Sequence, residues 1–177
     1  KEFYTLRDAL KKGRLFNKDA PKSPGQAYPK RKREIMSMIP PGGYWRELPP
    51  EIQKEYMKGS FHLSGGKTGM ARRISWDEPC LTLTCAPAQK QTERCHPDET
   101  RPFTVREYAR IQTFPDDWVF EGSMTSQYKQ IGNAVPVNLA EEIGKSLVKT
   151  LNAYYAEQTK PAKKLQDTKR RVAHAKT

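Results

Sequence analysis

The chain has 177 residues, of which 36% are hydrophobic, and its 14 prolines and 11 glycines indicate much loop. A dense, self-sufficient core is therefore not expected, and we expect part of the chain to be buried against another body. A net charge of +12 favours a polyanionic partner, and the lack of any apolar run of membrane-span length excludes a transmembrane helix.

The N-terminal segment is predicted to hold two short helices joined by a loop. Thr5 is a typical helix cap and Gly13 a typical helix end. Residues 16–29 are rich in proline, lysine and small polar residues, which is typical of an exposed connection. The basic stretch 30–39 predicts a helical turn that either contacts phosphates or forms a solvated face. The apolar face of the first helix would hold Leu6, Ala9 and Leu10.

The middle of the chain changes from helical to strand-like patterning. After a turn with two aromatic residues at 40–46, a short helix is predicted over Glu51–Met57. Residues 59–85 favour strands, because Cys80–Thr84 alternates threonine with leucine between glycines and prolines. Leu81 and Leu83 would then share one face. The stretch 86–100 is polar and irregular.

A second capped helix is predicted to begin at Thr104. Thr104 and Glu107 have the spacing of a capping box, and Pro115 stops the helix soon afterwards. Arg106, Glu107 and Arg110 lie within one turn of each other. They could form a buried cluster that braces a neighbouring loop, or they could be an ordinary solvated face.

The C-terminal part is predicted to be a glycine–asparagine turn followed by an amphipathic helix. Gly132 permits close approach of a ligand or another backbone, and Pro136 suits the first turn of a helix. The free amides at that helix start could hold a carboxylate or phosphate. The helix is expected over residues 138–151, and the basic tail from Lys160 onward is expected to be disordered. The apolar face of the helix would hold Leu139, Ile143, Leu147 and Leu151.

Three cysteines, Cys80, Cys85 and Cys95, are odd in number, and no charged-then-apolar leader opens the chain. Reduced thiols in a cytoplasm are the simplest interpretation. A zinc site is not expected, because the chain has no C-x2-C pair and His62 is distant from Cys95-His96.

Two stretches resemble a known family. RPFTVREYARIQTFPD (101–116) and QIGNAVPV (130–137) resemble the last two conserved motifs of the DNA cytosine-5 methyltransferases, in the family's order and near its spacing. Residues 76–83 resemble the core of that family's DNA-recognition domain. The resemblance implies an α+β fold: a small, irregular, β-containing recognition domain plus a C-terminal helix that completes the Rossmann-like α/β domain of a partner.

The resemblance also implies four segments. Residues 1–40 would be an N-terminal helix and basic linker, and residues 41–128 the target-recognition domain with its organising helix. Residues 129–155 would be the cofactor-wall motif and a helix that docks on the catalytic domain. Residues 156–177 would be a basic, disordered tail.

The same resemblance implies the site residues. Asn133, Ala134 and Val135 would line a pocket for S-adenosylmethionine that is shared with the partner chain. Arg106, Glu107 and Arg110 would be architectural. Residues expected to read bases or bind phosphates of double-stranded DNA are Lys67, Arg72, Arg73, Thr82, Leu83, Gln89, Lys90, Gln91 and Arg94.

The chain departs from the family pattern in its chemistry. The Gly-rich cofactor loop, the Pro-Cys-Gln nucleophile loop and the Glu-Asn-Val acid motif are absent from the sequence. Pro79-Cys80 is followed by Leu81, so we expect no catalytic residue here. The hypothesis is a DNA-recognition subunit that pairs with a larger catalytic subunit. The alternatives are a stand-alone DNA-binding or regulatory module, and a basic RNA-binding protein, for which no aromatic platform is present.

Overall fold

The computed structural model describes residues 3–159, and in that range the regular structure is helical. The chain divides into two compact units, Lys1–Leu139 and Ala140–Thr177. No helix among the described residues is long and apolar enough to cross a membrane. The α-helices are α1 (Leu6–Leu10), α2 (Lys30–Ser37), α3 (Pro50–Met57), α4 (Val105–Ile111), α5 (Met124–Asn133) and α6 (Val137–Gln158). Three 3₁₀ turns are η1 (Trp45–Glu47), η2 (Lys58–His62) and η3 (Lys90–Thr92).

Helices α1 and α4 both begin with the capping boxes that their sequences predict. The Thr5 side chain accepts from the Asp8 amide, while the Asp8 carboxylate accepts from the Thr5 amide. Thr104 and Glu107 exchange the same pair of bonds at the start of α4. Each box satisfies amides that a helix start leaves without partners.

The prediction of strands over residues 59–85 is wrong. The residues that the structure describes contain isolated bridges, such as Arg73 with Cys95, but no strand. Leu83 is buried while Leu81 is exposed, so the two do not share a face. The cause lies in the backbone bonds of Thr84, whose amide donates to the Tyr108 hydroxyl and whose carbonyl accepts from it. Because side chains satisfy this backbone, no neighbouring strand is needed.

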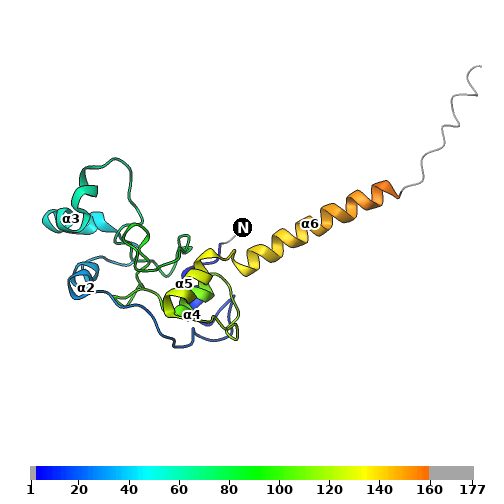
Figure 1. Ribbon diagram of the computed structural model, residues 1–177, viewed down its shortest axis with the longest axis horizontal. Coiled ribbons are helices and arrows are strands. Elements are labelled where there is room, and N and C mark those ends of the chain that lie inside the picture. The colour runs from blue at the N-terminus through cyan, green and yellow to red at the C-terminus, as the bar shows by residue number, and fades with distance from the viewer. Residues whose placement is uncertain (1–2, 160–177) are drawn as a thin grey trace, which may run out of the picture. The chain divides into compact units, whose positions relative to one another are not determined.

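Two hydrophobic clusters form the interior of the first unit. Figure 1 shows α4 beside α5, with α2 and α3 at a separate place in the unit. The first cluster packs α1, α4 and α5 together through buried residues that include Leu6, Phe103, Tyr108, Tyr128 and Ile131. The second cluster joins α2, η1 and α3 through residues that include Ile35, Met36, Trp45, Tyr56 and Met57.

The C-terminal part differs from its prediction in two ways. Gly132 and Asn133 form the end of helix α5, which begins after a Ser123 cap, and the turn follows at residues 134–136. Helix α6 runs to Gln158, beyond the predicted end at residue 151, so the first residues of the expected tail are helical. The predicted disorder beyond residue 159 lies outside the described residues.

Candidate functional site

Helix α4 braces the loop that follows it. Arg110 is fully buried and holds the Asp116 carboxylate with two bonds of 2.8 and 2.6 Å. Its guanidinium also donates to the Lys18 carbonyl and lies 4.2 Å from the centre of the Phe16 ring. Arg106 donates to backbone carbonyls at both ends of residues 115–118. Two arginines of one helix turn therefore fix a single loop.

Glu107 has a different partner from the one its spacing suggests. Its carboxylate is bound by Arg101 at 2.7 and 2.9 Å and by the Thr104 amide at 2.8 Å, and not by Arg106 or Arg110. Burial opposes ionisation of Glu107, yet the bonds from Arg101 and Thr104 hold its pKa below the ordinary value. Arg101 also pairs with Glu99. The positive charge of Arg101 is therefore compensated.

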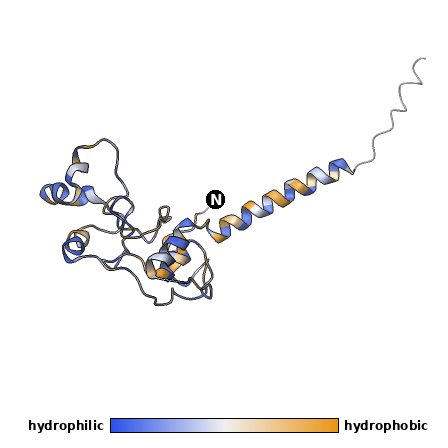
Figure 2. Cartoon of the chain, viewed as in Figure 1, coloured by the Kyte–Doolittle hydropathy of each residue, from blue (hydrophilic) through white to orange (hydrophobic). Residues whose placement is uncertain are grey.

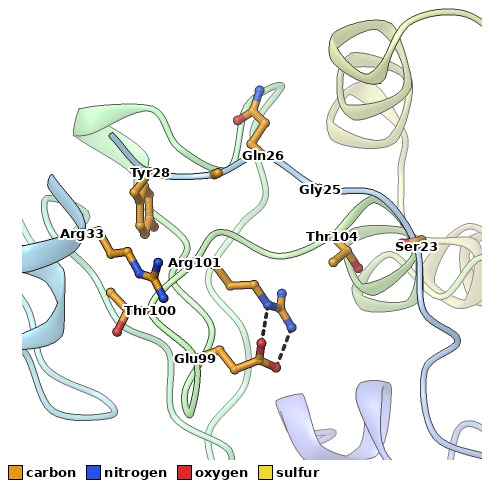
Figure 3. A pocket seen from close by; sticks show the side chains of 10 residues that line it. Ser23, Gly25, Gln26, Tyr28, Arg33, Glu99, Thr100, Arg101 and Thr104 are labelled. Carbon is orange, nitrogen blue, oxygen red and sulfur yellow. Dashed lines mark hydrogen bonds and ion pairs between the residues drawn. The ribbon is translucent and has the colours of Figure 1, made fainter. Parts of the chain in front are cut away.

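Figure 3 shows a hollow beside this ion-pair network, with the Arg101–Glu99 pair at its edge. The hollow has a volume of about 430 Å³ and is lined by hydroxyl, amide and guanidinium groups that include those of Gln26, Arg33 and Thr100. Among the described residues Arg33 has no ion pair, so one uncompensated cation faces this space.

Two of the arginines expected to contact DNA are interior residues of this chain. Arg73 is 4% exposed and donates to the Met36 and Pro97 carbonyls and to the Thr100 hydroxyl. Arg94 is 5% exposed and donates to the Thr82 and Glu93 carbonyls, and burial lowers its pKa. These guanidinium groups hold loops together, and the donors that bind interior oxygens are not available to bases. The Nε donor of each arginine is buried without a partner.

Leu83 is likewise buried, in the first cluster. The remaining candidates are accessible to different degrees. Arg72 is half-buried and lies 3.8 Å from Glu78. Lys67 donates to the Leu63 carbonyl and faces the Trp45 ring. The side chains that reach solvent most freely are Thr82, Gln89 and Gln91.

The cofactor-wall candidates sit where α5 meets the loop that precedes Gln89. A Cβ placed on Gly132 would lie 2.4 Å from the Thr84 carbonyl oxygen, so only glycine allows this approach of two backbones. Next to it, the Cys85 thiol donates to Asn133 Oδ1 at 3.1 Å. Asn133 and Val135 are exposed, and Ala134 is half-buried between them.

At the helix start expected to hold an anion, the first two amides are already bound, which differs from that expectation. The Val137 amide donates to the Gln112 carbonyl at 3.0 Å, and the Asn138 amide donates to the Thr113 hydroxyl at 2.9 Å. The first donors of α6 therefore bind the end of α4 and are not free for a carboxylate or phosphate.

Little in the sequence predicts the role of Gln112. Its side-chain amide donates to the Ile131 carbonyl at 3.1 Å and the Ala134 carbonyl at 3.0 Å, so it joins the end of α4 to the end of α5. The only available signal is a polar residue on the apolar face of a short helix, which is also typical of a helix end. Glu93 is buried between α2 and α3, and nothing in the sequence predicts that burial.

The chain is similar to known proteins over most of its length. The family model of C-5 cytosine-specific DNA methylase matches residues 1–149. Type II methyltransferase M.Eco47II of Escherichia coli is 76% identical over 148 residues, which are 84% of this chain and 36% of that protein.

Two further relatives are similar in the same way. Type II methyltransferase M.PspPI of Psychrobacter sp. (strain TA137) is 70% identical over 149 residues, which are 84% of this chain and 36% of that protein. Type II methyltransferase M.Sau96I of Staphylococcus aureus is 67% identical over 134 residues, which are 76% of this chain and 31% of that protein. The chain spans about a third of the length of these relatives. With a family match that covers most of its residues, the chain belongs to the C-5 cytosine-specific DNA methylases.

Proposed function

We propose that this chain is the DNA-recognition subunit of a cytosine-5 methyltransferase and works with a larger catalytic chain. The assembled enzyme would transfer a methyl group from S-adenosylmethionine to C5 of a cytosine flipped out of double-stranded DNA. The larger chain would supply the cysteine nucleophile, because this sequence contains no Pro-Cys-Gln loop. Membership of the family and the net charge of +12 support this proposal.

The observation that carries the two-chain arrangement is the apolar face of α6. Along this helix the large apolar side chains are roughly half exposed, with Ile143 at 49% and Leu147 at 60%. Figure 2 shows apolar and polar residues alternating around the helix. A stripe of this length is typical of a surface that a partner covers. The members of the stripe are Leu139, Ile143, Leu147 and Leu151.

The stripe also distinguishes the proposal from a stand-alone DNA-binding module. A module without a partner would have to bury these side chains in a small core of its own. Within the second unit the described residues form only the rest of α6, so that unit offers no apolar surface to cover the stripe.

One wall of a cofactor pocket would come from Asn133, Ala134 and Val135. Because Asn133 Oδ1 accepts from the Cys85 thiol, the amide nitrogen remains as a donor. A donor of this kind suits the carboxylate of S-adenosylmethionine, and the exposed Val135 side chain offers an apolar contact. The remaining walls would belong to the catalytic chain. The cofactor supplies the methyl group when it is bound.

Cys80 tests whether this chain carries chemistry of its own. The residue packs against the first cluster, and burial raises the pKa of its thiol to about 12. A thiol with such a pKa is protonated at neutral pH and is a poor nucleophile. Cys80→Ser in the assembled enzyme should therefore keep most of its methyl-transfer rate, whereas loss of a catalytic thiol would cost many orders of magnitude. A folded variant that binds DNA but shows no turnover would contradict the assignment.

The docking role of α6 can be tested by paired lysine substitutions. Leu147→Lys places a charge in the apolar stripe, and Asn152→Lys places one on the opposite side of the helix. The chain would be co-produced with the part of M.Eco47II that lies outside the matched region. We expect wild type and Asn152→Lys to form a one-to-one complex by size-exclusion chromatography, and Leu147→Lys to elute free. Equal complex formation by all three would contradict docking through α6.

A further inference from the structure

Four cations surround one pocket between α2, α3 and η3. The pocket has a volume of about 430 Å³, and its floor is formed by Ile35 and the buried ring of Tyr56. All three elements contribute cations: two come from α2, one from the end of α3 and one from η3. They are Arg31, Lys32, Lys58 and Lys90.

Two of these four charges are compensated. Arg31 holds the Glu55 carboxylate with bonds of 2.7 and 2.5 Å, and Lys32 lies 2.6 Å from the buried carboxylate of Glu93. Arg31 also pairs with Glu34 at 3.1 Å, so four cations less three carboxylates leave a charge of +1. The two cations that these carboxylates do not pair with are Lys58 and Lys90. Neither has an ion pair in the part of the chain that the structure describes. Burial raises the pKa of Glu93, and any protonation of Glu93 would only increase the positive excess.

Lys90 is held close to the other cations. Its ammonium lies 5.2 Å from the centre of the Tyr56 ring and 3.4 Å from the Met57 carbonyl, so the side chain is directed toward the end of α3. Burial, Lys58 and Lys32 together lower its pKa. The like charges repel one another, and an anion placed among them would remove that repulsion.

Lys58 occupies a backbone conformation that suits glycine better. Its φ is 51° and its ψ is −133°, at the point where α3 passes into η2. A side chain at positive φ is strained, and strained residues concentrate at binding and active sites. This strained backbone distinguishes Lys58 from an ordinary solvated surface lysine.

We infer that Lys58 and Lys90 form a phosphate-binding site for the backbone of DNA. The inference rests on the proposed function, and it divides the candidate residues of η3 by role. Gln89 and Gln91, on either side of Lys90, are exposed and suit base edges, whereas Lys90 turns toward the pocket. Phosphate contacts position a protein on the duplex, and base contacts select the sequence. The hollow of Figure 3 has one uncompensated arginine, compared with two uncompensated lysines here, so it is less suited to bind a phosphate.

The test uses the full chain and two variants that remove one charge each. Lys58→Gly removes the charge and relieves the strained backbone, so its melting temperature should rise while DNA binding weakens. Lys90→Gln removes the second charge. Lys54→Gln, on the same helix but outside the pocket lining, is the matched control. Duplexes with and without the target sequence are titrated over a range of salt concentrations.

We expect the slope of log K against log salt to fall by about 0.9 for each of Lys58→Gly and Lys90→Gln, and not for Lys54→Gln. Both variants should lose affinity for the two duplexes by the same factor. Unchanged slopes, or a loss confined to the target duplex, would overturn the site. Because Lys58→Gly is expected to be more stable than wild type, unfolding cannot account for its weaker binding.

Two other outcomes separate the site from the proposed function. If the wild-type chain binds neither duplex at any salt concentration, the proposed function and this site fall together. If wild-type binding is salt-dependent but both lysine variants keep its slope, the function stands and the site is wrong. A rise in melting temperature caused by inorganic phosphate, lost in Lys90→Gln without any change in DNA slope, would assign the pocket to a free anion and contradict the inference.

Discussion

Replacing Arg110 with methionine is expected to lower the free energy of unfolding by about 3–5 kcal/mol, as is typical when one partner of a buried ion pair is removed. The methionine fills similar space but leaves the Asp116 carboxylate and the Lys18 carbonyl without their guanidinium donor. Urea denaturation followed by circular dichroism measures the loss. The double variant Arg110→Met with Asp116→Asn should recover part of it, because no carboxylate is then left without its arginine.

The Arg110–Asp116 pair predicts how the stability of the chain depends on pH. Hydrogen bonds donated by Arg110 hold the pKa of Asp116 below the ordinary value. A carboxylate with a lowered pKa in the folded state contributes stability above its unfolded pKa of about 3.9, and that stability is lost as pH falls through the folded value. The wild-type chain should therefore lose stability on acidification below about pH 4. An equally steep acid loss in Arg110→Met would show that other carboxylates are responsible.

Gly132→Ala is expected to destabilise the chain by about 1–3 kcal/mol or more, since the added methyl group would overlap the Thr84 backbone and not a flexible side chain. The control is Gly144→Ala in α6, where an added Cβ meets nothing within 4 Å. That variant should gain about 0.5–1 kcal/mol, because alanine is a better helix former.

The pair of variants separates packing from helix propensity. Both glycines are in helices, so propensity alone would make both alanine variants more stable. We expect opposite signs in urea denaturation. If Gly132→Ala were as stable as wild type, the contact between α5 and Thr84 would not be tight, and the cofactor-wall candidates would not be held against the loop before Gln89.

Local signals predicted five of the six α-helices that the structure describes, and no helix was predicted over α5. The capping boxes at Thr5 and Thr104 determine where two helices begin through bonds three residues apart, so a short window of sequence contains the whole cause. The amphipathic pattern of α6 is similarly local. Gly132 was expected to allow a close approach of a ligand or of another backbone, and the structure shows that it is the backbone of Thr84.

The wrong strand prediction and the burial of two arginines both depend on partners distant in sequence. Cys80–Thr84 alternates like a strand, but the Tyr108 hydroxyl, 24 residues from Thr84, satisfies the backbone of Thr84 instead. Arg73 and Arg94 have the side chains of DNA readers, and their burial depends on carbonyls brought close by the fold. Charge and residue type identify donors, but only the fold determines whether those donors are already bound.

The central claim is that this chain provides DNA recognition and one cofactor wall to a catalytic domain on another chain. Transfer of a labelled methyl group from S-adenosylmethionine to duplex DNA tests it most directly, with this chain alone, the catalytic chain alone, and the two mixed. We expect transfer only in the mixture, and its loss when Leu147→Lys replaces the wild-type chain. Methyl transfer by this chain alone, at a rate comparable with the mixture, would contradict the claim.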